Sequence, residues 1–257
     1  GHLMIDELRC YVINLDSSTK RLDEFNAAFN KISLKIEKVS AVDGKLIDNE
    51  TFSDDDLCKK QMGRGLQPGE VGCYLSHKKA IEKFLSTDAS YAIIFEDDAI
   101  PNIGFEKTVA TIIEKFLKHN NLAAAVNLGA MDFKYSSKVL AVDDKILRCA
   151  HRFPMLATAV LWTRYGAKTF LESSSPITMP YDNFLRYLFS GTNEAFSIQP
   201  PIIRFSGIES DIAARNENIR RSARNRSKLY FYRKQRRTIR DKISAIKGYI
   251  NWAFSKK

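Results

Sequence analysis

The sequence predicts an α/β fold, with helices packed on a mostly parallel central sheet. Short runs of apolar β-formers alternate along the chain with stretches whose apolar residues recur at helical spacing, which is the pattern of parallel sheets joined by helices. One such run ends in three consecutive acidic residues, Glu96, Asp97 and Asp98, as a strand that ends at a ligand-binding sheet edge would. At 257 residues and 44% hydrophobic content, the chain is long and apolar enough to bury a full core.

The first expected strand covers residues 9–15, a continuous apolar run that fits a strand buried on both faces. Residues 16–19 supply N-cap side chains, and a helix over residues 20–29 follows, with its apolar residues on one side. Residues 34–39 alternate between apolar and polar and predict a second strand. We expect residues 45–66 to be irregular.

A second helix is expected from Pro68 to about Leu85, since proline is tolerated in a first helical turn and Glu70 suits the positive N-terminal dipole. The strand with the acidic end follows this helix. The later elements are, in chain order, a helix over 105–117, a short strand over 123–128, a hairpin over 131–150, a strand over 155–162, a helix over 165–171, and a proline-bounded loop leading to Tyr181-Asp-Asn-Phe184.

The acidic strand end is the clearest chemical signal. Three adjacent carboxylates repel one another, and a divalent cation, which takes oxygen ligands and bridges phosphates, would offset that cost. The alternative is a solvated acidic turn. The P-loop pattern G-x-x-x-x-G-K-[ST] and the dinucleotide pattern G-x-G-x-x-G are both absent, so the acidic motif indicates a nucleotide-sugar transferase more than either of those classes.

Charge divides the chain into two parts. The formal net charge is +10, yet residues 211–257 carry 15 Lys and Arg against 3 Asp and Glu, so the basic character belongs to the tail. We therefore expect a globular domain over residues 4–214 and a basic helical tail with interleaved aromatic residues over 215–257. The four cysteines form no C-x-x-C pair, which argues against a zinc knuckle and a disulfide framework.

Four motifs in order carry a family resemblance: Val12-Ile-Asn-Leu-Asp-Ser-Ser-Thr-Lys-Arg21, Ala41-Val-Asp-Gly44, Gly69-Glu-Val-Gly-Cys-Tyr-Leu-Ser-His77 and Phe95-Glu-Asp-Asp98. Together they resemble glycosyltransferase family 25, the lipooligosaccharide glycosyltransferases related to collagen galactosyltransferases. The resemblance covers residues 9–211. It implies a GT-A-like fold, a UDP-sugar donor (often UDP-galactose), a divalent metal (Mn²⁺ or Mg²⁺), inversion at the anomeric carbon and, for bacterial members, a lipopolysaccharide acceptor.

Given this resemblance, Asp98 is the expected metal ligand, and Glu96 is expected to reach the ribose or to share the metal. Residues i and i+2 of an extended segment point to the same side, so both side chains can face one ligand. Asp97 can exchange roles with either neighbour and is counted with the donor-binding residues.

The other expected donor-binding residues lie in the remaining motifs. Asn14 is expected to contact uracil and Arg21 to pair with phosphate, unless Arg21 is an ordinary surface charge. Asp43 is expected to accept the uracil N–H, unless it only serves the turn before Gly44.

Ser76 and His77 are expected on the helix that carries Glu70, with His77 reaching the nucleotide or the metal unless it is structural. Thr158 is expected to line the donor site, with a buried strand threonine as its alternative.

Inverting transfer needs a general base near the acceptor hydroxyl, and Asp182 is the candidate. Its alternative role is a helix N-cap, which aspartate serves well. Ser210 and Asp211 resemble a family Ser-x-Ile ending, and the sequence assigns them no role.

The basic tail predicts association with an anionic membrane, where a lipid-linked oligosaccharide acceptor would lie. The expected location is therefore cytoplasmic, on the inner face of a bacterial inner membrane. A packing or dimerising helix and a nucleic-acid-binding segment are the alternatives. The competing functions are a non-catalytic family member that binds membrane or glycan, and a metal-dependent phosphoesterase.

Overall fold

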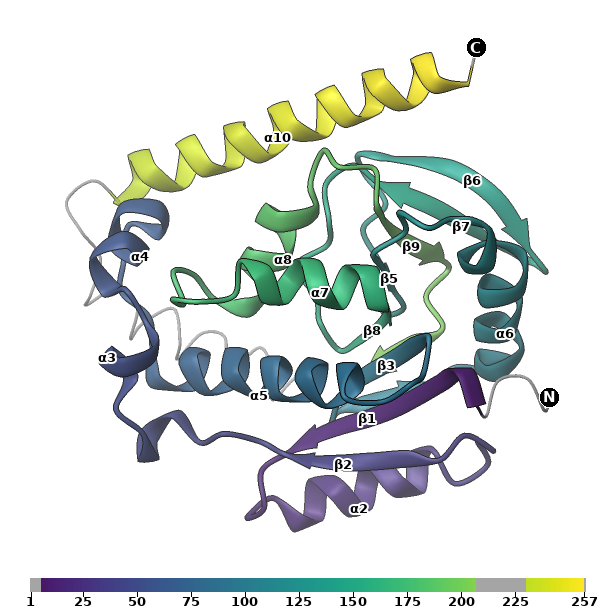
Figure 1. The fold of residues 1–257 in the computed structure, drawn as a ribbon, viewed down its shortest axis with the longest axis horizontal. Helices are drawn as coiled ribbons and strands as arrows, with labels where there is room; N and C mark the ends of the chain where they lie inside the picture. Colours follow the sequence, from purple (N-terminus) through teal and green to yellow (C-terminus); the bar gives the residue numbers. More distant parts are fainter. Residues whose placement is uncertain (1–5, 207–229, 257) are drawn as a thin grey trace.

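The computed structural model describes residues 6–206 and 230–256. Its centre is an eight-stranded sheet in the order β2-β1-β3-β8-β5-β9-β7-β6 (Figure 1). The α/β fold and the large central sheet predicted from the sequence are confirmed. The boundary expected at residues 214 and 215 lies outside the described residues.

The first half of the sheet is parallel. Strand β1 (Leu8–Asn14) lies between β2 (Ile36–Ser40) and β3 (Tyr91–Glu96) and runs parallel to both. These three strands therefore end at the same edge of the sheet, the position at which open α/β sheets bind ligands.

The second half is mixed. Strand β8 (Ala159–Thr163) runs antiparallel to both β3 and β5 (Ala125–Asn127), and β5 pairs in parallel with β9 (Ala195–Gln199). Because β5 and β3 share a direction, β5 also ends at the ligand-binding edge. The predicted hairpin is β6 (Ser136–Val142) with β7 (Lys145–Ala150), and it completes the sheet through β7 and β9.

Helices cover both faces of the sheet. One hydrophobic cluster joins the sheet to α5 (Pro68–Leu85), α7 (Arg164–Glu172) and α8 (Tyr181–Phe189). A second cluster joins the other face to α2 (Thr19–Ala28) and α6 (Phe105–Lys115). Strand β1 supplies alternate residues to the two clusters, which explains its continuous apolar sequence.

The prediction that residues 45–66 are irregular was wrong. They form the 3₁₀ helix η1 (Gly44–Leu46) and the helices α3 (Asn49–Phe52) and α4 (Asp55–Met62). Aspartates start all three, because the side chains of Asp43, Asp48 and Asp54 accept backbone N–H groups of the first turns. Asp48 and Asp54 are therefore helix caps, while Glu50, Asp55 and Asp56 lie in the first turns of α3 and α4.

Other boundaries also differ from the prediction. Residues 155–158 precede β8 instead of forming its first half. Strand β9 was not predicted, nor was the small sheet of β4 (Ala99–Pro101) and β10 (Ile203–Phe205). These short strands depend on distant partners, which their own sequences do not reveal.

Two sequence motifs meet where η1 packs on α5. A Cβ atom on Gly72 would lie 2.6 Å from the carbonyl oxygen of Val42, and one on Gly44 would overlap the carbonyl group of Pro68. Only glycine allows this approach of backbones. Gly44 and Gly72 thus fix α5 against the end of β2.

The described part of the tail is one helix, α10 (Tyr230–Ser255), which lies across the molecule beside α4 (Figure 1). Its buried residues are Asp241, Ala245 and Gly248. Asn193, in the turn before β9, donates from Nδ2 to the carbonyl oxygen of Gly248 at 2.8 Å and bonds His151 Nδ1 at 2.8 Å. Among the described helices, none is both long and apolar enough to cross a membrane.

Candidate active site

The ends of β1 and β3 are joined by a polar network. Arg21 donates from Nε and Nη2 to Oδ1 of Asp97, at 2.9 and 2.6 Å. Asn14 donates from Nδ2 to Asp97 Oδ2 at 2.9 Å and to the carbonyl oxygen of Ser18 at 3.1 Å. The structure therefore brings together three predicted donor-site residues, with Asp97 bonded by its neighbours through both carboxylate oxygens.

Asn14 retains one free polar atom in this network. Its Oδ1 is buried and has no hydrogen-bond partner among the described residues. A buried amide oxygen without a donor is costly, and a ligand N–H would satisfy it.

A group of carboxylates lies beside this network. Burial raises the pKa of Glu96 well above its ordinary value, and the negative charges of Asp182, Asp98 and Asp97 raise it further. Burial, with a contribution from Glu70, raises the pKa of Asp182 to about 6, while Arg186 lowers it. Helix α8 thus brings Asp182 to Glu96, at the acidic end of β3, although the two residues are far apart in the sequence.

The N-cap alternative for Asp182 finds no support in the structure. Helix α8 is preceded by Pro180 as its cap residue, and Asp182 lies inside the first turn without a capping hydrogen bond. Its carboxylate remains available to the site. The negative charge also suits the N-terminal end of the helix dipole.

His77 is buried, and its ring stacks on that of Tyr181 with 3.9 Å between centroids. Neither ring nitrogen has a hydrogen-bond partner among the described residues, and burial lowers the pKa of His77 to about 3. Cys73, one turn earlier on α5, and Glu96 each place a ligand atom within 4.8 Å of it. The neutral imidazole can therefore coordinate a metal.

The residues present fit a divalent cation in two overlapping ways, and both include Glu96. The predicted pair, Glu96 and Asp98, offers oxygen ligands of the kind that Mn²⁺ and Mg²⁺ prefer. Cys73, His77 and Glu96 offer a softer set that suits Zn²⁺. A bound cation would offset the clustered negative charge that raises the pKa of Glu96.

Other predicted donor-site residues serve the architecture. Ser76 is buried, and its hydroxyl accepts from Val42 N at 2.8 Å and donates to the carbonyl oxygen of Gly72 at 2.6 Å. Asp43 caps η1 through a bond from Lys45 N at 3.0 Å. Thr158 is buried, and its carbonyl oxygen accepts the N–H of Glu96 at 2.9 Å. Thr158 thereby fixes the backbone of the acidic motif. Ser210 and Asp211 lie outside the described residues.

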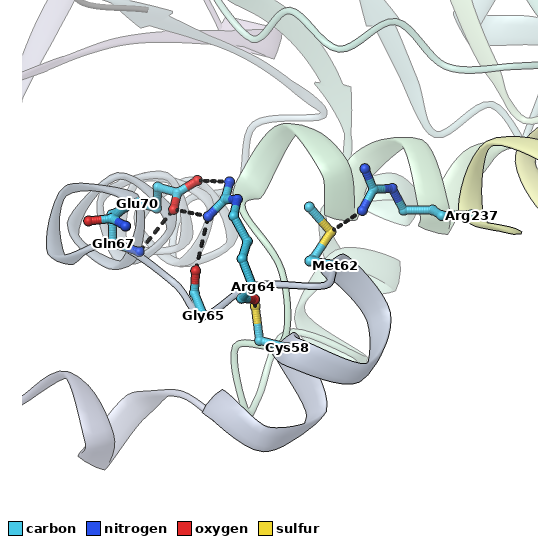
Figure 2. A network of polar contacts seen from close by, with 7 residues as sticks. All are labelled: Cys58, Met62, Arg64, Gly65, Gln67, Glu70 and Arg237. Carbon is cyan, nitrogen blue, oxygen red and sulfur yellow. Dashed lines mark hydrogen bonds and ion pairs between the residues drawn. The ribbon is translucent and has the colours of Figure 1, made fainter. Parts of the chain in front are cut away.

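The start of α5 is held by a network that sequence reasoning missed (Figure 2). Arg64 forms a two-bond ion pair with Glu70, at 2.7 and 2.8 Å, and Glu70 also accepts from Gln67 N at 2.9 Å. The network holds the loop after α4 against the helix that carries Cys73 and His77. Glu70 is therefore a positioning residue.

A cavity of about 300 Å³ lies one helical turn along α8 from Asp182, which is not among its lining residues. Two arginines line it, Arg152 and Arg186, and Arg186 is one helical turn after Asp182 on α8. Asn127, at the end of β5, shapes its wall: the buried side chain donates to the carbonyl oxygen of Leu156 at 2.6 Å and accepts from Gly129 N and Ala130 N. No sequence motif indicated this cavity, because its residues come from separate segments.

Comparison with known proteins gives a consistent family. The model of "Glycosyltransferase family 25 (LPS biosynthesis protein)" matches residues 7–185. A "Glycosyltransferase 25 family member" of Aedes aegypti is 25% identical over 195 residues, covering 70% of this chain and 30% of that protein. A "Probable inactive glycosyltransferase 25 family member 3" of Rattus norvegicus is 26% identical, covering 70% and 32%.

A "Procollagen galactosyltransferase 1-A" of Xenopus laevis is 26% identical over 109 residues, covering 40% of this chain and 18% of that protein. The chain thus spans about a third or less of the length of these relatives. Among solved structures, a glycosyltransferase involved in the glycosylation of the major capsid of PBCV-1 aligns over 81% of this chain and 98% of its own, with a TM-score of 0.37 and 8% identity.

Proposed function

Because the chain belongs to glycosyltransferase family 25, we propose that it is an inverting enzyme that moves a hexose, galactose first among the candidates, from a UDP-sugar to a lipooligosaccharide acceptor. The observation that carries the proposal is the convergence of Asn14, Glu96 and Asp182 at the sheet edge where parallel strands end. A buried acceptor atom, a carboxylate cluster and a candidate base are the parts that such a transfer needs.

In this proposal Asp182 is the general base. Its ionised carboxylate takes the proton of the acceptor hydroxyl while that oxygen bonds to the anomeric carbon. The bond from the anomeric carbon to the UDP oxygen breaks on the opposite face, so the configuration inverts. A base with a pKa of about 6 is ionised at neutral pH and still basic enough to receive the proton.

The donor is proposed to lie over the ends of β1 and β3. Asn14 Oδ1 accepts the uracil N–H, the hydrogen bond that it lacks in the described structure. Asp97 holds Asn14 and Arg21 in place, so it acts through its neighbours. Glu96 and Asp98 would hold a divalent cation, which supplies Lewis-acid stabilisation of the departing diphosphate.

Donor hydrolysis tests this function without an acceptor. UDP release is measured from a panel of UDP-sugars with Mn²⁺, with Zn²⁺ and with a chelator, beside calorimetric titration of UDP. Metal-dependent release from one donor supports the proposal and names the sugar. The absence of both UDP release and UDP binding would contradict the proposal and favour a non-catalytic protein. Three of the relatives carry the word inactive in their names.

We further propose that the protein works at the inner face of a bacterial inner membrane through α10. One face of this helix packs on the domain, while Ile239, Ile243, Ile246 and Ile250 form an exposed stripe at spacings of three and four residues. Lysines and arginines flank the stripe, a combination that suits an anionic lipid surface.

Sedimentation with anionic vesicles at low and high salt tests this location. Replacing Ile243 and Ile246 by serine should reduce binding at both salt concentrations, because apolar contact is lost. The matched control, Lys234→Gln and Lys247→Gln together, should weaken binding mainly at low salt. Equal sedimentation of all variants, or none by the unaltered protein, would contradict the proposal.

A further inference from the structure

The cavity one helical turn from Asp182 along α8 has more positively than negatively charged lining residues. Its lining includes Lys134, Arg152 and Arg186, against one carboxylate, Asp132. Arg152 Nε is buried without a hydrogen-bond partner among the described residues. Arg152 also lines the cavity, where its positive charge can attract an anion.

The two guanidinium groups are held close enough to disfavour each other. The pKa of Arg186 is lowered to about 10, chiefly by burial and then by the positive charge of Arg152, with Asp241 and Asp132 opposing. Arg186 is anchored through Nε, which donates to the carbonyl oxygen of Phe153 at 2.7 Å. Its position is therefore fixed, and an anion between the two arginines would relieve their repulsion.

Tyr135 supports the same wall. Its backbone has φ of 49°, a conformation that bulky residues rarely adopt, and its ring lies 6.0 Å from the guanidinium carbon of Arg152. Backbone conformations of this kind cluster at ligand sites. The turn before β6 thus holds the Tyr135 ring against Arg152. An aromatic ring beside a guanidinium group would suit a charged sugar.

The cavity adjoins the site of transfer but not the nucleotide end. Its lining residues come from segments 130–135, 152–156, 186 and 205, and none comes from β1, β2 or β3. Two residues beyond Leu156, Thr158 binds the backbone of Glu96, and Arg186 lowers the pKa of Asp182. Asp182 does not line the cavity, so a saccharide held there would have to extend past Arg186 to bring a hydroxyl to the candidate base.

We infer that this cavity binds an anionic group, a phosphate or a carboxylate, on the acceptor saccharide, with Arg152 and Arg186 as its ligands. The inference rests on the proposed function, because it takes Asp182 as the base for the acceptor hydroxyl. Arg152 and Arg186 then act as specificity residues that place a charged acceptor with a hydroxyl toward Asp182. A neutral sugar would leave both arginines unpaired.

Calorimetry at constant ionic strength tests the inference. The probes are a hexose 6-phosphate, a hexuronic acid, the neutral hexose, inorganic phosphate and UDP. The unaltered protein should bind at least one charged sugar about tenfold or more tighter than the neutral hexose. Arg152→Gln should remove most of that preference, Arg152→Lys should retain part of it, and Lys168→Gln on α7 is the control for charge alone.

Each result decides a separate question. No preference for charged sugars, or equal losses in Arg152→Gln and Lys168→Gln, would overturn the inference. If Arg152→Gln weakens UDP as much as hexose 6-phosphate, the cavity holds the donor diphosphate and the acceptor assignment is wrong. Binding of charged sugars without any UDP binding would contradict the proposed function while the anion site stands. Should Arg152→Gln fail to fold, judged by its melting curve, Lys134→Gln with Arg152→Lys repeats the test.

Discussion

Beyond the larger effect of burial, the negative charge of Asp182 raises the pKa of Glu96, although the two carboxylates belong to different elements, α8 and β3. Like charges that are buried together destabilise the fold unless protons or a cation neutralise them.

Asp182→Asn should abolish transfer and leave UDP binding unchanged, since the amide cannot accept the proton. The loss expected from removing a general base is about 10²- to 10⁴-fold in turnover. Asp182→Glu is the control and should retain some activity. Loss of UDP binding together with activity would instead indicate a structural role for Asp182.

The same variant should be more stable than the unaltered protein at neutral pH. The folded state raises the pKa of Asp182 to about 6, so it binds the proton more tightly than the unfolded chain does. Stability is therefore lost as pH rises from about 4 through 6. Asp182→Asn lacks this loss, and its stability advantage should grow over that pH range to about 3 kcal/mol. Urea unfolding at pH 4 and pH 7.5 measures the free energy of unfolding of the variant and of the unaltered protein. A stability advantage that does not change with pH would contradict an origin in the Asp182 carboxylate.

Transfer should depend on pH through the same group. The general base acts in its ionised form, so the rate should rise about tenfold per pH unit below pH 6 and level off above it. A pH profile of kcat/KM measures this. In Asp182→Glu the midpoint should move, whereas an unmoved midpoint would assign the titration to another group.

Arg21→Gln should weaken UDP binding with little effect on stability. The Arg21 side chain is 56% exposed, and ion pairs of such groups contribute less than about 1 kcal/mol to folding. Without Arg21, however, the Asp97 carboxylate loses two of its bonds and no longer fixes Asn14. Calorimetry of UDP and a melting curve separate the two effects. Lys20→Gln, which removes an exposed positive charge next to Arg21 in the chain, is the control.

The two glycines of Gly69-Glu-Val-Gly72 should respond in opposite ways to alanine. Gly72→Ala places a Cβ atom 2.6 Å from the Val42 carbonyl oxygen and 2.7 Å from Gly44 N, and should cost about 3 kcal/mol or more. Gly69 has nothing within 4 Å of its Cβ position, so Gly69→Ala should be neutral or slightly stabilising. Denaturant unfolding of both variants checks this. Equal effects would refute the packing argument.

The sequence predicted those parts of the fold that local patterns determine. The run over residues 9–15 is apolar because β1 is buried on both faces, and Pro68 with Glu70 marked the start of α5. The mixed half of the sheet was not predictable in the same way, since β9 takes its place only by pairing with β5 and β7. Residues 45–66 were misjudged because aspartate serves both turns and helix caps.

For the candidate site, motif order located Asn14, Arg21 and Glu96 together, and the structure places Asn14 and Arg21 on Asp97 as one network. The sequence did not separate ligand-facing residues from supporting ones. Ser76 and Asp43 bond backbone N–H groups, and this supporting role becomes visible only once the structure shows their partners. Arg152 has no local signature, because the cavity and Asp182 come from distant segments.

The contact of Asn193 with α10 also limits how far the chain can be shortened. A truncation before Tyr230, made to remove the basic residues and improve solubility, would strip the cover from Gly191, whose Cβ position lies 2.6 Å from the Ser244 carbonyl oxygen. It would also expose His151, whose ring meets those of Tyr249 and Trp252 edge-on. The shortened protein would lose these contacts and leave the buried His151 open to solvent, so point substitutions on the outer face of α10 are the better route to a soluble variant.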